Sequence, residues 1–302
     1  MNRPTTKPAP LWLTVAPLLF VTLWAGGYAT AKIALQYSQP LTLLTLRFGL
    51  VLVVMLVALI MLRPPMPKRP IDWLHLAIVG FLLQTIYFGF TYIAFASGIG
   101  AGTLALLMSL QPIVVGLAAP RWSGELISWQ CWLGLLLGLI GVTIVITIRA
   151  GIEPPTAIGF GSAVLALAGI TAASLWEKRF GLSHHPVTSN LVGYAAGLIA
   201  IMPLALWLET GNGRLNLLSD VQWTWQFAAA LVYLVIGNSV IAVGLLLSMI
   251  RVGEVSRVSA LFYLVPPLAA IIAWLLIGEV IPPLAWPGIV IAAAGVYIAT
   301  RQ

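Results

Sequence analysis

The sequence predicts an all-α integral membrane protein in which ten transmembrane helices form two inverted five-helix repeats. Three observations carry this prediction. The chain is 61% hydrophobic and only 8% charged, whereas soluble domains are about 25% charged. Apolar runs long enough to cross a bilayer, about 20 residues each, recur along the whole chain. Residues of the first half also return in the second half in the same order.

The repeat is visible in pairs of matched residues. Lys32 and Pro40 recur as Lys178 and Pro186. The later part of each half is matched as well, with Pro112, Gly124, Glu125, Gly141 and Val142 returning as Pro266, Gly278, Glu279, Gly295 and Val296. Since each half holds an odd number of spans, the second half enters the membrane from the opposite side. We therefore expect two domains, residues 11–148 and 157–300, packed as one bundle.

The positions of the apolar runs predict where each span lies. In order, the spans cover residues 11–31, 41–62, 73–97, 101–119, 128–148, 157–177, 187–208, 223–249, 256–277 and 283–300. The first run follows Arg3 and Lys7 and ends in small residues, which imitates a cleaved secretory signal. It is longer than a typical signal core, and its ending recurs in the second half. We therefore expect it to remain as the first helix of the fold.

The distribution of lysine and arginine predicts the orientation. With the N-terminus inside, most of the 15 basic residues fall in cytoplasmic segments, as the positive-inside rule requires. Lys32, Arg149 and Arg214 would lie outside, and Arg47 lies within the second span. We expect both termini in the cytoplasm and the protein in the cytoplasmic (inner) membrane. The net charge of +7 follows from this bias and from attraction to anionic lipid, so no nucleic-acid partner is expected.

Prolines interrupt two matched spans. Pro112 lies in the fourth span, and Pro266 and Pro267 lie in the ninth. Proline removes a backbone hydrogen bond and bends a helix, and interrupted helices at corresponding places point to a central binding site. A purely structural bend is the alternative, because proline is common in membrane helices.

Two tight hairpins are candidate gates. Gly98, Gly100 and Gly102 lie between the third and fourth spans, and Gly253 lies between the eighth and ninth. Glycine lets the chain bend and lets helices approach closely. The alternative is that these glycines only satisfy turn geometry.

Polar and aromatic residues within the spans are candidates for lining a binding site. Gln84, Tyr87 and Thr91 are spaced to share one helix face. The full set is Trp24, Tyr28, Gln84, Tyr87, Thr91, Met108, Gln111, Asn238, Ser239, Ser259 and Tyr263. Together they would form a neutral cavity with aromatic walls, which suits an aromatic or hydrophobic amino acid. The alternative is that the tryptophans and tyrosines mark the membrane interfaces.

Charged groups at membrane depth are scarce. Arg47 either extends to the outer interface or attracts a substrate carboxylate in the cavity. The eight acidic residues fall near span ends or in loops, which favours facilitated export over a buried proton relay.

The ordered motifs resemble those of a known family. The segments from Trp24 to Lys32 and from Thr103 to Pro112, and Arg47 followed by phenylalanine, resemble an EamA repeat, and the segment from Ser256 to Pro266 supplies the second copy. The chain is similar to ten-helix members of the drug/metabolite transporter superfamily over nearly its whole length. This resemblance implies export of small organic solutes, amino acids and related metabolites among them. Two departures, Gly193 opposite Arg47 and Ile170 opposite Trp24, predict an asymmetric site.

The leading hypothesis is a carrier that exports small amphipathic metabolites, aromatic or hydrophobic amino acids above all, by alternating access around a cavity between the two repeats. Another metabolite or a drug-like solute is the alternative substrate. An enzyme is disfavoured because the three histidines lack clustered acids and no nucleophile motif is present. A channel is disfavoured because no polar ring repeats around an axis.

No cofactor or metal is expected, and the single cysteine, Cys131, cannot form an internal disulfide. The expected partners are the small-molecule substrate and the lipid bilayer. Gly134, Gly138 and Gly141 form a stripe suited to a neighbouring helix of the same or another chain. Ten spans in one chain are compatible with a functional monomer.

Overall fold

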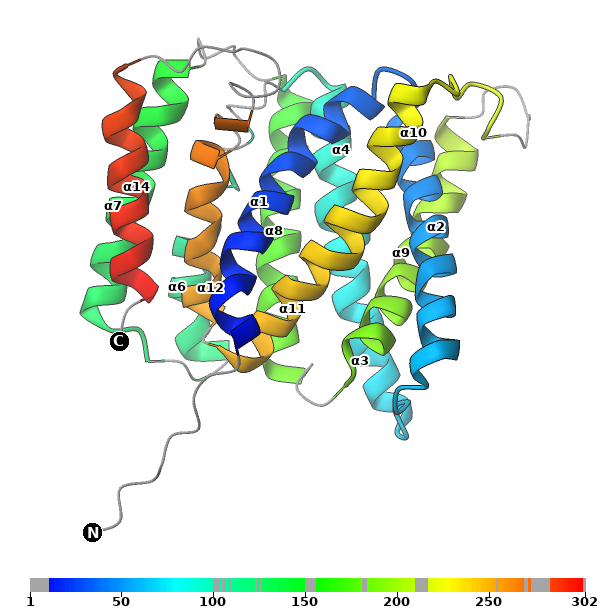
Figure 1. Cartoon of the computed structure of the whole chain (residues 1–302), viewed down its shortest axis with the longest axis horizontal. Helices are drawn as coiled ribbons and strands as arrows, with labels where there is room; N and C mark the ends of the chain where they lie inside the picture. Colours follow the sequence, from blue (N-terminus) through cyan, green and yellow to red (C-terminus); the bar gives the residue numbers. More distant parts are fainter. Residues whose placement is uncertain are drawn as a thin grey trace.

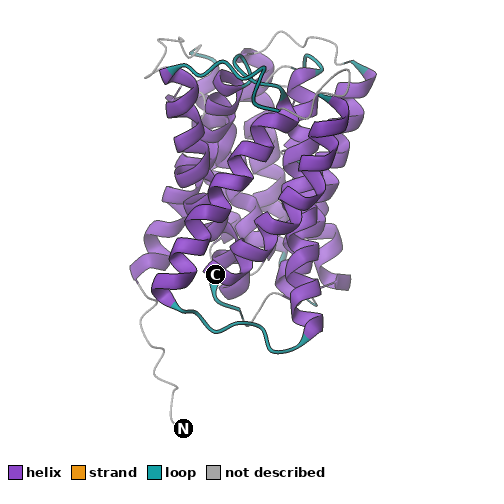
Figure 2. Ribbon diagram, turned by 90° about the vertical axis from the view of Figure 1, so that its right-hand side faces the viewer, coloured by secondary structure: helices purple, strands orange, loops and turns teal. Residues whose placement is uncertain are grey.

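The computed structural model describes residues 11–99, 104, 107–108, 110–122, 124, 126–149, 156–180, 184–209, 217–253, 255–268, 271–272 and 283–300. All regular secondary structure within these residues is helical. The helices stand side by side in one bundle, with the loops gathered at its two ends (Figures 1 and 2). Helix is present in each of the expected spans, so the predicted fold class is confirmed.

The helices of the two halves follow the same order. The first half contains α1 (Leu11–Ala34), α2 (Pro40–Leu62), α3 (Pro70–Gly80) continuing into η1 (Phe81–Gly89) and α4 (Phe90–Ala96), α6 (Gln111–Trp122) and α7 (Trp129–Arg149). The second half contains α8 (Ala157–Phe180), α9 (Pro186–Leu208), α10 (Trp225–Val232) continuing into η2 (Tyr233–Ala242) and α11 (Val243–Val252), α12 (Val255–Ala260) with η3 (Leu261–Leu264), and α14 (Ala285–Thr300).

Helices of the two halves pack against each other in matched pairs. α2 lies beside α9 at one side of the bundle, and α7 lies beside α14 at the other (Figure 1). Between them, α6 packs on α12, α1 on η2, and η1 on α8. The first span of each half therefore contacts the third span of the other half, as expected for inverted repeats related by a two-fold axis. The centre of the bundle is shared by both repeats.

Several of these contacts are close enough to require glycine. A Cβ atom on Gly80 of α3 would overlap backbone atoms of Gly193 in α9. On α7, a Cβ atom on Gly134 or Gly141 would overlap backbone atoms of α14. Small residues let membrane helices approach closely and gain van der Waals contact. The glycine stripe of α7 thus packs against a helix of its own chain.

Proline and a carboxylate define the upper ends of α2 and α9, as oriented in Figure 1. Pro40 occupies the first turn of α2, where its missing N–H needs no intrahelical partner. The carboxylate of Glu209, just after α9, accepts from the backbone N–H of Leu41 (2.8 Å) and of Thr42 (2.7 Å). A negative charge at a helix N-terminus is stabilised by the exposed N–H groups there. Glu209 therefore caps α2 and holds it to α9.

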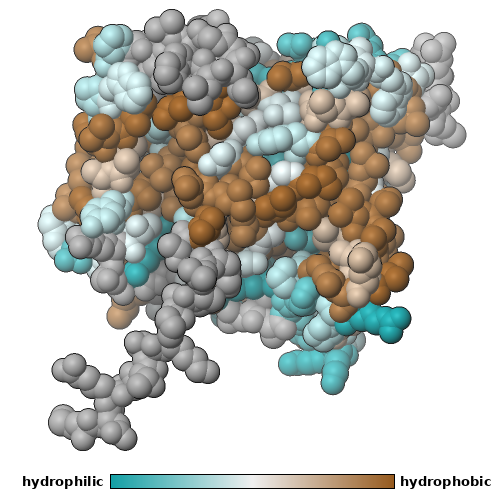
Figure 3. Space-filling model, viewed as in Figure 1, coloured by the Kyte–Doolittle hydropathy of each residue, from teal (hydrophilic) through white to brown (hydrophobic). Residues whose placement is uncertain are grey.

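On the face seen in Figure 3, an apolar belt lies between two more hydrophilic ends. Exposed leucine, isoleucine and tryptophan side chains supply it, among them Leu18, Ile60, Ile199 and Trp207. By length and composition, five helices of the described residues are apolar enough to cross a bilayer, namely Pro40–Leu62, Pro70–Ala96, Ala157–Phe180, Pro186–Leu208 and Trp225–Val252. These features make the chain a multi-pass membrane protein.

Gly80 lies where α3 and α9 approach closely, whereas Gly49 has open space around it. Alanine substitutions at these two glycines should therefore change the stability of the protein differently. Gly80→Ala should destabilise the protein by about 1–3 kcal/mol, because the new methyl group forces the two helices apart. Gly49→Ala should be neutral or stabilise by up to about 1 kcal/mol, because a Cβ atom on Gly49 meets no other atom within 4 Å. Thermal unfolding of the purified protein in detergent measures both. Equal unfolding temperatures for the two variants would contradict the packing described.

Candidate functional site

Both central spans widen into π-helices at matching places. η1 and η2 carry Gln84 and Asn238, which occupy equivalent positions in the two repeats. π-helical turns are rare and occur frequently at functional sites. Hydrophobic periodicity does not distinguish a π-helix from an α-helix of the same composition, so neither π-helix was predicted. The site is built on these two segments together with α1 and α2.

Aromatic side chains form one wall of the centre. Trp24 of α1 stacks on Tyr87 of η1, with ring centroids 6.0 Å apart and an interplanar angle of 18°. Trp24 also contacts Phe88 at 5.9 Å and Phe262 at 5.4 Å between centroids. The hydroxyl groups of Tyr28 and Tyr87 are hydrogen-bonded at 3.1 Å. Trp24, Tyr28 and Tyr87, singled out from the sequence, therefore lie together.

Arg47 also lines the centre and is fully buried, at 0% exposure. Its Nε donates to Ser239 Oγ (2.7 Å), its Nη1 to Tyr92 Oη (3.0 Å) and its Nη2 to Asn238 Oδ1 (2.6 Å). The guanidinium carbon lies 4.3 Å from the ring centroid of Phe88, in a cation–π contact. Arg47 therefore does not extend to the outer interface; it joins α2 of the first repeat to η2 of the second.

A small cavity lies between the aromatic wall and Arg47. Its volume is about 20 Å³, close to the space that one water molecule requires. The lining residues come from α1, α2, η1, α4 and η2: Trp24, Gly27, Tyr28, Ala31, Arg47, Tyr87, Phe88, Thr91, Tyr92, Phe95 and Asn238. Phe88 and Tyr92 were not singled out from the sequence. Tyr92 carries a polar group within a span, and that signal could have identified it.

The other residues selected from the sequence lie away from this cavity. Gln84 lines a separate cavity of about 10 Å³ near the lower end of the bundle. The π-helix changes the helical register, so Gln84 does not share a cavity with Tyr87 and Thr91, contrary to the single stripe expected from α-helical spacing. Ser239 contacts Arg47 from behind the cavity.

A second polar group lies on α6, α12 and η3. Gln111 Nε2 donates to Ser259 Oγ at 3.2 Å, which links the fourth span to the ninth. Tyr263 is buried against α7, where a Cβ atom on Gly138 would overlap its ring. Met108 is also buried. None of these four side chains is among the residues that line the central cavity.

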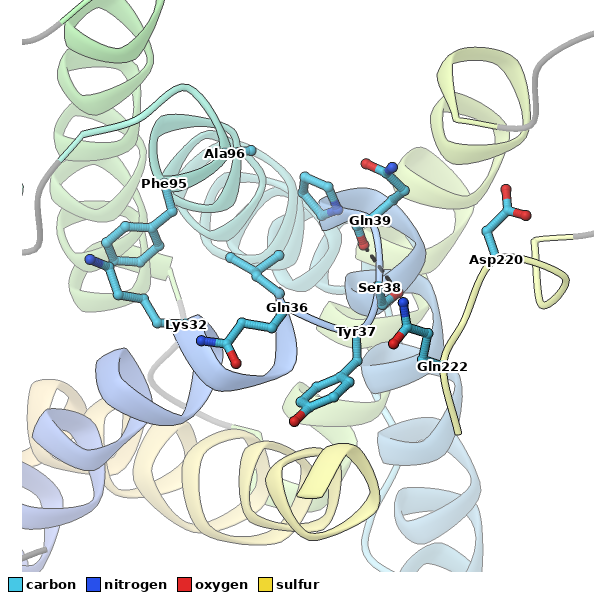
Figure 4. Close-up of a pocket in the computed structure, with 11 residues that line it drawn as sticks. Lys32, Gln36, Tyr37, Ser38, Gln39, Phe95, Ala96, Asp220 and Gln222 are labelled. Carbon is cyan, nitrogen blue, oxygen red and sulfur yellow. Dashed lines mark hydrogen bonds between the residues drawn. The ribbon is translucent and has the colours of Figure 1, made fainter. Parts of the chain in front are cut away.

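A vestibule of about 540 Å³ opens at the upper end of the bundle, lined by residues of α1, the α1–α2 turn, α4 and the segment before α10. Lys32 and Phe95 lie on one side of it, and Asp220 and Gln222 lie on the other (Figure 4). The Lys32 Nζ is 5.5 Å from the ring centroid of Phe95. Phe95 lines both the vestibule and the central cavity.

The lower end is closed by a network of charged side chains. Lys178 Nζ donates to the carbonyl oxygen of Gly253. Arg251 forms an ion pair with Glu177 and donates to the carbonyl oxygen of His184 (2.5 Å) and to Ser189 Oγ (2.6 Å). This network, made by Lys178, Arg251 and Glu177 with their partners, ties α8, α9 and α11 together. Lys178 was singled out from the sequence only as the repeat of Lys32, and the network was not predicted.

The predicted kinks and hairpins have different local structures. In the fourth span, residues 107 and 108 are helical, Leu110 is a turn and α6 begins at Gln111, so the described part of this span is interrupted just ahead of Pro112. The ninth span changes from α-helix to 3₁₀-helix just ahead of Pro266 and Pro267, so it is interrupted where expected. Gly98 has φ of 85°, a value that favours glycine. Gly253 follows the end of α11, and Gly100 and Gly102 lie outside the described residues.

Comparison with known sequences gives the family. The EamA-like transporter family matches residues 11–147 and again residues 154–301. The chain is 26% identical to the "Probable amino-acid metabolite efflux pump" of Escherichia coli (strain K12), over 94% of this chain and 93% of that protein. It is 26% identical to the "Uncharacterized transporter YvbV" of Bacillus subtilis (strain 168), over 90% and 87% of the two chains.

Two further comparisons extend this result. The "Probable terminal-alkyne amino-acid exporter" of Streptantibioticus cattleyicolor is 29% identical over 67% of this chain and 65% of its own. A solved crystal structure has the same fold, with a TM-score of 0.78 at 20% identity and 97% of both chains covered. The family covers nearly all of the sequence, and its members are transporters and not enzymes. This chain therefore belongs to the EamA-like transporter family and is a multi-pass membrane transporter within the drug/metabolite transporter superfamily.

Proposed function

We propose that this transporter exports amino acids, aromatic and hydrophobic ones above all, from the cytoplasm by alternating access. The observation that carries the proposal is the central cavity, where aromatic rings face a hydrogen-bonded cation at the junction of the two repeats. Aromatic rings offer apolar contact to a side chain, and the polar groups suit the charged backbone of an amino acid. The relatives named as amino-acid exporters support the same substrate class.

The positive-inside rule supports placing the lower end of the bundle in the cytoplasm. Lys178, Arg179, Arg251 and the Arg63 end of α2 all belong to that end. α1 begins there and α14 ends there (Figure 1), which is in keeping with cytoplasmic termini. In this orientation the vestibule opens to the outside and the network at Lys178 closes the cytoplasmic side.

The two hairpins are proposed as the gates. Lys178 is bonded to the carbonyl of Gly253 beside the cytoplasmic hairpin, whereas its counterpart Lys32 contacts the ring of Phe95 in the open vestibule. Inverted repeats alternate access when one repeat rocks against the other around a fixed site. In the cytoplasm-open state, Lys32 would then bond to the outer hairpin near Ile99, the counterpart of Gly253, and Lys178 would be released.

Transport can be measured in proteoliposomes loaded with unlabelled phenylalanine, by uptake of labelled phenylalanine from outside. Exchange should saturate with concentration, as expected for a carrier and not for a channel. Tyr87→Ala should raise the concentration for half-maximal exchange about tenfold, because one ring of the aromatic wall is lost. Phe81→Ala, on the lipid-facing surface of the same π-helix at 43% exposure, is the matched control and should leave exchange unchanged.

The outcomes separate the alternatives. Absence of phenylalanine exchange, with saturable exchange of another class of metabolite, would reject the amino-acid proposal and retain the carrier. Equal effects of the two alanine substitutions would reject the aromatic wall as part of the site.

The gating proposal predicts that loss of the Lys178 bond favours the cytoplasm-open state. Lys178→Met should raise the maleimide labelling rate of a cysteine placed at Leu247, which lines the small cavity at the cytoplasmic end, about tenfold. The native Cys131 is changed to alanine throughout. Lys68→Met, at an exposed lysine of the same end, is the control. Lys32→Met should lower the labelling rate, because the proposed bond of Lys32 in the cytoplasm-open state is lost. If Lys32→Met instead raises the rate as much as Lys178→Met does, the proposal that the two lysines bond to their hairpins in alternate states is wrong.

A further inference from the structure

The charge of Arg47 has no negative partner among the described residues. The side chains that bond to it are two hydroxyl groups and one amide, and the ring beside it is that of Phe88. Burial of a cation is costly unless an anion compensates it. The partly buried cation of the lower network differs, because Arg251 is paired with Glu177. The charge of Arg47 is therefore left without compensation among the described residues of the central site.

Arg47 has more N–H donors than its three bonds to Ser239, Tyr92 and Asn238 use. A guanidinium carries five N–H groups, and the three bonds to Ser239, Tyr92 and Asn238 use three of them. Arg47 itself lines the cavity, next to the ring of Phe88. Arginine presents a planar fork that matches a carboxylate, so a carboxylate in the cavity would meet both the charge and the remaining donors.

Thr91 provides an independent sign of a missing polar group. Its side chain is 3% exposed, and its hydroxyl has no hydrogen-bond partner within the described part of the chain. A buried hydroxyl without a partner is uncommon because its desolvation is not compensated. Thr91 lines the same cavity as Arg47. A solute that brings hydrogen-bonding groups into the cavity would satisfy it.

The second repeat has no equivalent of this cation. Gly193 occupies the matching position in α9, and it is packed against Gly80. The cation therefore lies on one side of the pseudo-two-fold axis, with the rings of Trp24 and Tyr87 lining the same cavity. An asymmetric site of this kind holds an asymmetric solute in one orientation.

We infer that Arg47 binds the carboxylate of the transported solute, and that this transporter therefore selects solutes carrying a carboxylate and an apolar side chain. The inference rests on the proposed export function and names the group by which the substrate is recognised. The apolar side chain contacts Trp24 and Tyr87, and the hydroxyl of Thr91 contacts the polar end of the solute.

The test compares phenylalanine with phenylalaninamide, which lacks only the carboxylate charge, as competitors of labelled phenylalanine exchange. In the wild-type protein the amide should inhibit at least tenfold more weakly than phenylalanine. In Arg47→Met, of similar length and no charge, this ratio should fall to about one. A ratio that persists in the variant, with exchange lowered for both compounds, would mean that Arg47 only holds α2 to η2 and would overturn the inference.

Two further measurements keep the result decisive. If Arg47→Met does not fold, the wild-type ratio decides alone, because equal inhibition by acid and amide overturns the inference without any variant. 3-Phenylpropionate and 2-phenylethylamine, which keep only the carboxylate or only the amine, are tested for exchange in the same vesicles. Exchange of the carboxylate without exchange of phenylalanine would reject the amino-acid function and uphold the role of Arg47; exchange of the amine alone would reject both.

Discussion

Arg47 lies where the two repeats meet, and its surroundings set the geometry of the centre. Its three nitrogens bond to one residue of the first repeat and two of the second. A guanidinium at membrane depth needs such partners, because lipid offers none. Tyr194 of α9 donates to the backbone carbonyl of Ser239 at 3.2 Å, which fixes the π-helix that carries two of those partners. The position of η2, the tilt of α2 and the shape of the cavity thus depend on one another.

The two ends of the bundle differ although the repeats are related. The upper end holds a vestibule of about 540 Å³, and the lower end holds a cavity of about 10 Å³ beneath a bonded network. Each repeat supplies a lysine at its own end, and within the described residues Lys178 is bonded to a hairpin carbonyl whereas Lys32 lies over the ring of Phe95. The two repeats are related, but the bundle is open at one end and closed at the other. A second arrangement of similar energy results when the repeats exchange their contacts, so that the open and closed ends are exchanged. The alternating access proposed above uses this relation and needs no additional moving part.

The spans and the repeat could be predicted because the membrane imposes them locally. A helix must remain apolar for about 20 residues, and Pro40 and Pro186 set the starts of α2 and α9 where the sequence placed them. Contacts between distant segments could not be predicted in the same way. The capping of α2 by Glu209 joins residues 168 positions apart, and no local pattern indicates which helix end a loop carboxylate will reach.

The central site was only partly predictable for a related reason. Trp24, Tyr28 and Tyr87 were found because polar and aromatic groups at depth usually face the bundle interior. Gln84 was grouped with Tyr87 on the basis of α-helical spacing, and the π-helix separates them. The sequence left open whether Arg47 extends to the interface or stays in the centre of the bundle. The answer depends on the partners that η2 provides, because the same side chain on a lipid-facing surface would extend to the interface.

The small volume of the cavity constrains how a solute binds. A space of about 20 Å³ holds one water molecule, whereas pockets for small organic ligands are typically about 300 Å³ or more. Binding must therefore displace side chains that now contact each other. Phe95, which lines both the vestibule and the cavity, packs edge-on against Tyr28 at 6.3 Å between centroids. The bond between Tyr28 and Tyr87 joins two neutral hydroxyl groups, and neutral hydrogen bonds are weaker than charge-assisted ones. For the proposed solute we therefore expect these aromatic contacts to open at lower cost than the bonds of Arg47, so that the solute enters past the aromatic rings.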